Sequence, residues 1–151
     1  MEPWTVAFDG FSTMGAAGAG VIIHNPEGEV WRFAHQLSQG VTNNQAEYEA
    51  LLLALRFLVA RKVRKVVIRG DSQLVVRQAL EEFKCKDPQL QIFLREVHSL
   101  LQQLTDVVLE DIPRGENDEA NNLAQCVSGF RRRHIPREGE CSQVDRPSLD
   151  W

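Results

Sequence analysis

Hydrophobic residues of this 151-residue chain follow two different periods. Short stretches that are apolar, or that alternate between apolar and polar residues, predict strands at 4–9, 21–23, 30–37, 63–69 and 107–112. Longer stretches with apolar residues three or four positions apart predict helices at 44–62, 72–83, 88–104 and 118–130. The glycine-rich segment 15–20 is expected to be a flexible lead into the second strand.

The predicted elements follow the order βββαβααβα. The sequence Asn-Pro-Glu-Gly at 25–28 is a turn signal between the second and third strands, so the first three strands should form an antiparallel meander. This order indicates an α/β fold in which helices cover a five-stranded mixed sheet. Residues 1–130 are therefore expected to form one domain. Residues 131–151 are rich in Arg, Glu, Ser and Pro and are expected to be a flexible polar C-terminal tail.

Composition and charge narrow the class of protein. A chain with 43% hydrophobic residues is long enough to bury a sizeable core. No apolar stretch approaches the roughly 20 residues that span a bilayer, and the first residues lack a signal-peptide pattern, so we expect a cytoplasmic protein with no membrane partner. The net charge of −4 argues against binding nucleic acid by bulk attraction. Basic clusters at 61–65, 84–86 and 131–137 are either local phosphate-binding patches or solvated ends of elements.

Three acidic residues are expected to meet at one edge of the sheet. Asp9 and Asp71 fall at the carboxyl ends of the first and fourth predicted strands, where open α/β sheets bind ligands. Glu47 heads the apolar stripe of the longest helix, which must face the sheet. Each acid alone has a structural explanation as a turn residue, a helix cap or a helix N-terminal acid. Together they favour a cation site, because clustered carboxylates repel one another unless positive charge neutralises them.

Several motifs along the chain resemble type-1 ribonuclease H. They are Asp9-Gly10, the segment Thr-Asn-Asn-Gln-Ala-Glu at 42–47, Gly70-Asp71-Ser72, and Arg114 followed by Asn117, Ala120, Leu123 and Ala124. The resemblance covers residues 4 to about 130. The short link at 82–88 is similar to the compact members of that family, which lack an inserted basic helix and loop.

The resemblance implies an endonuclease that hydrolyses the RNA strand of RNA/DNA hybrids by two-metal catalysis and leaves 5′-phosphate products. It assigns the catalytic and metal-binding roles to Asp9, Glu47, Asp71 and Asn121. Two Mg²⁺ or Mn²⁺ ions would bind at the site together with the substrate, because hard cations prefer oxygen ligands. The implied partner is the RNA/DNA hybrid, and the protein is expected to be a monomer with no obligate protein partner.

The same resemblance implies a set of substrate contacts. Thr42 would contact a DNA phosphate, and the two asparagines after it would reach the minor groove of the hybrid. Helix capping is a compatible alternative role for this segment. The complete set of implied substrate-binding residues is Gly10, Thr42, Asn43, Asn44, Ser72 and Arg114.

The residue at position 121 departs from the family pattern, because it is an amide where a fourth carboxylate is expected. Asn121 keeps the shape of an aspartate but lacks its charge, so we expect impaired cleavage. Asp118 lies three residues earlier, roughly 60° away around the helix, and is expected to be a cap or first-turn acid. The alternative function is a catalytically inactive RNA/DNA hybrid-binding protein.

Two other classes of protein are disfavoured by the residues themselves. The related 3′–5′ exonucleases begin with Asp-x-Glu on the first strand, whereas this chain has Asp9-Gly10-Phe11. A small-molecule α/β binding domain is disfavoured because no glycine-rich phosphate loop joins a strand to a helix.

Overall fold

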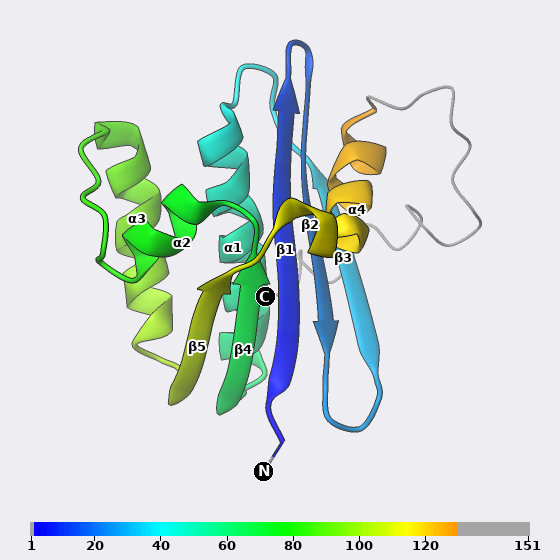
Figure 1. The fold of residues 1–151 in the computed structure, drawn as a ribbon, viewed down its shortest axis with the longest axis vertical. Helices are drawn as coiled ribbons and strands as arrows, with labels where there is room; N and C mark the ends of the chain where they lie inside the picture. Colours follow the sequence, from blue (N-terminus) through cyan, green and yellow to red (C-terminus); the bar gives the residue numbers. More distant parts are fainter. Residues whose placement is uncertain (1, 130–151) are drawn as a thin grey trace.

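One mixed sheet of five strands forms the centre of the fold (Figure 1). The computed structural model describes residues 2–129. The strands are β1 (Trp4–Thr13), β2 (Ala16–His24), β3 (Val30–Gln36), β4 (Lys65–Gly70) and β5 (Asp106–Asp111), in the spatial order β3-β2-β1-β4-β5. The first three strands pair antiparallel, while β4 runs parallel to both β1 and β5. The predicted element order and the mixed sheet are confirmed.

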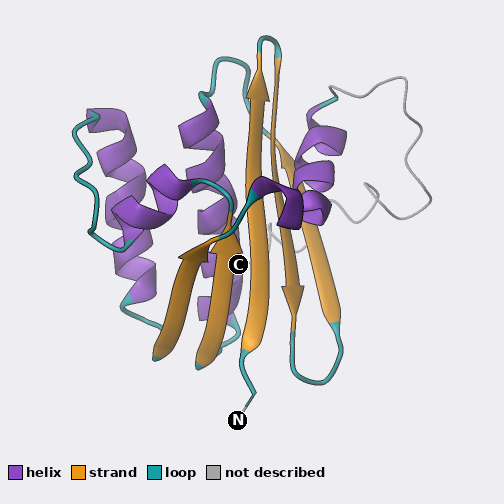
Figure 2. Cartoon of the chain, in the orientation of Figure 1, coloured by secondary structure: helices purple, strands orange, loops and turns teal. Residues whose placement is uncertain are grey.

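Helices cover both faces of this sheet (Figure 2). The helices are α1 (Asn43–Ala60), α2 (Gln73–Ala79), α3 (Pro88–Leu101) and α4 (Asp118–Ser128), with a 3₁₀ turn, η1 (Arg114–Glu116), before the last one. Helix α1 packs on β1 and β2 and against α3; eleven of its eighteen residues are buried, and nine of these belong to the larger hydrophobic core. Helix α4 packs on the other face, where a smaller core forms from Ile22, Ala34, Ala120 and Leu123.

The glycine-rich segment is part of β2, so the prediction of a flexible lead was wrong. A Cβ atom at Gly18 would lie 2.2 Å from the carbonyl oxygen of Ala124, and one at Gly20 would lie 2.5 Å from that of Ala120. Both glycines therefore lie directly beneath the backbone of α4. Glycine is needed here because it lets a helix approach the sheet closely, and not because the chain must be flexible.

The first strand is also longer than predicted. It continues to Thr13, so Asp9 lies in the middle of β1, paired with Gly20 of β2, and not at the end of a strand. The parallel neighbour β4 does end nearby, because its last residue Gly70 pairs with Phe8. Asp9 therefore still lies at the carboxyl edge of β4.

Helix α2 is shorter than predicted, because it ends at Ala79 and Glu81 takes a left-handed conformation with φ of 64°. None of the helices within residues 2–129 is both long and apolar enough to cross a membrane. The tail predicted at 131–151 lies outside the described residues.

Candidate active site

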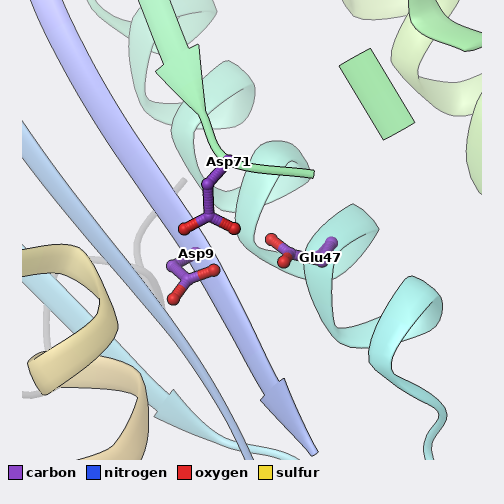
Figure 3. Close-up of side chains that lie close together, drawn as sticks. All are labelled: Asp9, Glu47 and Asp71. Carbon is purple, nitrogen blue, oxygen red and sulfur yellow. The ribbon is translucent and has the colours of Figure 1, made fainter. Parts of the chain in front are cut away.

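Three carboxylates converge from β1, α1 and the residue that follows β4 (Figure 3). Asp9, Glu47 and Asp71 each present one oxygen, and these oxygens all lie within 4.8 Å of one another. Asp9 is 1% exposed and Glu47 is 6% exposed. The predicted meeting of these three acids is confirmed.

Glu47 reaches β1 because Gly10 has no side chain. A Cβ atom at Gly10 would lie 2.2 Å from the carbonyl carbon of Ala46, so only glycine permits this approach of α1 to β1. The Gly10 backbone N–H then donates a hydrogen bond of 2.9 Å to Oε1 of Glu47. The structure thus gives Gly10 a role in positioning a carboxylate, while its predicted contact with substrate stays a prediction.

The start of α1 is fixed by a capping box. The Thr42 hydroxyl accepts from the backbone N–H of Gln45 at 3.1 Å, and the Gln45 side chain accepts from the Thr42 N–H at 3.0 Å. Asn43 Oδ1 accepts from the backbone N–H of Ser12 at 3.0 Å, which ties this turn to the end of β1. Thr42 and Asn43 are exposed and Asn44 is half-buried, so the capping turn remains available for the predicted contact with substrate.

The remaining predicted substrate contacts lie around the same edge. Ser72 caps α2 by accepting from the backbone N–H of Val75 at 3.2 Å, which fixes the chain directly after Asp71. Arg114 is exposed in η1, and its positive charge partly offsets the burial that raises the pKa of Asp9. Their contacts with substrate stay predictions.

Burial dominates the electrostatics of the two most enclosed acids. Removal from water raises the pKa of Asp9 to about 6, and the charge of Asp71 acts in the same direction. Burial and the charges of Asp9 and Asp71 raise the pKa of Glu47 well above its ordinary value. Without a cation, the site therefore favours a state in which fewer than three negative charges are present.

Amide groups contact these carboxylates from the opposite side. Asn121 on α4 donates from Nδ2 to Oδ2 of Asp9 at 2.6 Å. Asn117 is 2% exposed and donates from Nδ2 to the carbonyl oxygen of Phe8 at 2.9 Å and to Oδ2 of Asp71 at 3.0 Å. Asn117 belongs to a family motif in the sequence but is not predicted at the site, and an asparagine just before a helix is commonly a cap. Its side chain makes no capping bond.

Asp118 has the structural role expected from the sequence. It lies exposed in the first turn of α4 and is not among the three clustered acids. An acid there is favoured by the partial positive charge at the helix N-terminus. The choice of position 121, and not 118, as the residue facing Asp9 is therefore supported by the hydrogen bond of Asn121.

The oxygen atoms of the three carboxylates suit a hard divalent cation. Oδ1 of Asp9 is buried and has no hydrogen-bond partner within the described part of the chain. A buried carboxylate oxygen without a donor calls for a positive partner. Carboxylate oxygens are the ligands that Mg²⁺ and Mn²⁺ prefer.

Sequence comparisons show what this chain is similar to. The family model described as reverse transcriptase-like matches residues 7–127. Ribonuclease HI of Halobacterium salinarum is 33% identical over 119 residues, which are 78% of this chain and 60% of that protein. The Bacillus subtilis protein YpeP is 33% identical over 133 residues, which are 82% of this chain and 58% of that protein. The chain thus spans less than two thirds of the length of these relatives.

Solved structures of similar sequence share the fold. The crystal structure of RNase H1 from Halobacterium salinarum has a TM-score of 0.77 at 29% identity, covering 83% of this chain and 97% of that one. LC11-RNase H1 in complex with an RNA/DNA hybrid has a TM-score of 0.76 at 29% identity, covering 84% and 97%. Fold, acidic cluster and sequence agree, and the chain belongs to the type-1 ribonuclease H family.

Proposed function

We propose that this chain is an endonuclease that hydrolyses the RNA strand of RNA/DNA hybrids and leaves 5′-phosphate ends. The observation that carries the proposal is the convergence of Asp9, Glu47 and Asp71, whose oxygens lie within 4.8 Å of one another in a largely buried site. The similarity to a ribonuclease HI and to an RNase H1 solved with an RNA/DNA hybrid supports this choice of reaction and substrate.

In this proposal Asp9, Glu47 and Asp71 hold two Mg²⁺ or Mn²⁺ ions together with the substrate, and residue 121 is the fourth catalytic position. When bound, such a pair of ions supplies an activated water and stabilises the leaving oxygen. The protein's own task is to keep the three carboxylates in place. Gly10 orients Glu47 through its N–H, and Asn117 orients Asp71 through its amide.

Hybrid binding is proposed to occur along the start of α1 and the segment before α4. The exposed Thr42 and Asn43 and the half-buried Asn44 supply hydroxyl and amide groups that suit a phosphate and the minor-groove edges of bases and sugars. The exposed Arg114 supplies a positive charge beside the acids. Gly10 and Ser72 border the same acids and complete the proposed contacts. A single copy of the chain, acting in the cytoplasm, would suffice for this function.

Asn121 is proposed to weaken catalysis, because its amide supplies at most a neutral oxygen where a carboxylate would add a charge. A second candidate function is therefore a hybrid-binding protein without turnover. The observation that favours it is the hydrogen bond from Asn121 to Asp9, which occupies one of the Asp9 oxygens.

The two candidates are separated by cleavage and binding measured on matched duplexes. RNA/DNA, RNA/RNA and DNA/DNA duplexes of one sequence would be incubated with Mg²⁺ or Mn²⁺, and the Asp9→Asn variant would serve as the catalytic control. We expect slow cuts in the RNA strand of the hybrid only, and binding that weakens with salt as counterions are released. Hybrid binding without cuts would support the binding protein, whereas a preference for double-stranded DNA would contradict both.

A further inference from the structure

The amide of Asn121 has a defined orientation in this structure. An ionised carboxylate only accepts hydrogen bonds, so the group that faces Asp9 must be the NH₂ end, and Nδ2 lies 2.6 Å from Oδ2 of Asp9. The oxygen end points the other way and accepts from Nε2 of Gln125 at 3.0 Å. Gln125 follows Asn121 by one helical turn on α4, so the two side chains share a face of the helix.

This orientation does not suit a cation beside Asp9. A divalent cation needs an oxygen ligand, and Asn121 presents hydrogen atoms instead. The amide must turn over by half a rotation before its oxygen faces Asp9. Its NH₂ end would then face Gln125, which also presents an NH₂ end, and two donors would oppose each other unless the Gln125 amide turned as well.

Within residues 2–129, no hydrogen bond fixes the far end of the Gln125 amide. Its Oε1 atom is buried and has no hydrogen-bond partner within residues 2–129. The two amides can therefore pair in either of two orientations, each with one hydrogen bond between them. The group on the inner side of Asn121, either the bare Asp9 carboxylate or a cation bound to it, decides which orientation is favoured.

We propose that Gln125 is a positioning residue for position 121, and that the amides of Asn121 and Gln125 turn over together when a divalent cation binds at Asp9. This inference rests on the cation site of the proposed function and adds a coupled change on α4. Gln125 is neither a ligand nor a catalytic residue in this scheme. Its amide turns with that of Asn121, so the hydrogen bond between the two side chains is kept when residue 121 offers its oxygen to the site.

Substitutions at position 125 can favour one orientation or the other. In Gln125→Glu the partner only accepts, so it favours the orientation in which the NH₂ end of Asn121 faces residue 125 and the oxygen faces the site. In Gln125→Lys the partner only donates, so the present orientation should be retained. We expect Gln125→Glu to bind Mg²⁺ at least about tenfold more tightly than Gln125→Lys, the order of one hydrogen bond between the two orientations.

A matched control separates orientation from charge. Asn122 is exposed on the same helix, so Asn122→Glu and Asn122→Lys add the same charges without facing Asn121. Calorimetric titration with Mg²⁺ should give a difference of less than about threefold between this pair, because exposed charges are screened by solvent and salt. Equal differences for the pairs at 122 and 125 would overturn the proposal.

The direct readout is NMR of the side-chain NH₂ groups during a Mg²⁺ titration. The signals of Asn121 and Gln125 should shift together, and the cross-relaxation between the Asn121 NH₂ and the Asp9 side chain should disappear. In Gln125→Glu this cross-relaxation should disappear at a lower Mg²⁺ concentration than in the parent. If Mg²⁺ binds in a manner that depends on Asp9 while both NH₂ groups stay unchanged, the inference fails and the cation site stands. If Mg²⁺ binding does not depend on Asp9, both the proposed cation site and this inference are contradicted.

Discussion

The two sides of the site are built from different chemistry. The side formed by β1, α1 and the end of β4 supplies carboxylates, whereas the side formed by α4 and the residue before it supplies amides. The carboxylates repel one another, and two of them have raised pKa values because they are buried. The amides give each neighbouring carboxylate a hydrogen-bond donor, which is part of what a cation would provide. The contacts of Asn117 and Asn121 therefore stabilise the metal-free protein, and the contact of Asn121 also competes with a cation for Asp9.

Removing a charge from the carboxylate side should have the largest effect. We expect Asp9→Asn to lower the rate of hybrid cleavage by about 1,000-fold or more, because several kcal/mol of transition-state stabilisation depend on the charges that hold the cations. Single-turnover cleavage of a labelled hybrid measures this loss. The exposed Asp118 provides the control, and Asp118→Asn should stay within about threefold of the parent rate, as for a surface substitution. Loss of cleavage in Asp118→Asn, together with an unchanged rate in Asn121→Asp, would show that Asp118 is the fourth ligand.

Adding a charge to the amide side should have the next largest effect. We expect Asn121→Asp to raise cleavage by at least about 100-fold, because a fourth carboxylate restores charge stabilisation at the cations. The same single-turnover assay, with hybrid affinity measured in parallel, separates chemistry from binding. An unchanged rate with unchanged affinity would mean that position 121 lies outside the catalytic set.

Asn117 connects the two sides, since its amide donates to the Phe8 carbonyl and to Asp71. In Asn117→Asp the shape is kept but both donors are lost, and a new negative charge faces Asp71. We expect the free energy of unfolding to fall by about 1–3 kcal/mol, the cost of leaving buried acceptors without donors. Urea denaturation measures this change. Asn122→Asp on the exposed face of α4 is the matched control and should leave stability unchanged.

The smallest predicted effect is a slope of stability against pH. The pKa of Asp9 is raised from 3.8 to about 6 in the folded state, so the folded protein binds this proton more tightly than the unfolded chain. The metal-free protein should therefore lose stability as pH rises from about 4 to about 6, and the raised pKa of Glu47 extends the loss to higher pH. Thermal melting in chelator measures the slope. Added Mg²⁺ should reverse it, because cations bind the ionised carboxylates of the folded state. A melting temperature that rises with pH in chelator would contradict this assignment.

The fold could be predicted from the sequence because most elements carry a clear period. The β-branched run of β4 and the apolar stripe of α1 are examples, and both were placed within about two residues of their observed bounds, as is usual for such elements. Strand β2 was harder to predict from the sequence. The close packing of α4 demands glycine at positions 18 and 20, so the hydrophobic pattern of a strand is missing there. That contact depends on residues about 100 positions apart, which no local pattern reports.

The three acids of the site could be predicted because Glu47 heads the apolar stripe of α1, Asp71 follows β4, and Asp9 lies on β1 beside the end of β4. Asn117 and Gln125 could not, since their roles depend on which atoms their amides face after folding. An asparagine before a helix and a glutamine within one are common on solvated surfaces. Only the burial of their oxygens and the direction of their hydrogen bonds show that they belong to the site.

Diffraction from crystals soaked in Mn²⁺ is the sharpest test of the cation site at Asp9, Glu47 and Asp71, because anomalous scattering locates the ion without any assumption about activity. We expect an anomalous peak within about 2–2.5 Å of oxygens of Asp9, Glu47 and Asp71, at distances typical of hard cations and carboxylates. Asp9→Asn crystals soaked in the same way should lose this peak. A parent crystal with no peak among the three carboxylates, at a Mn²⁺ concentration that supports cleavage, would contradict the account.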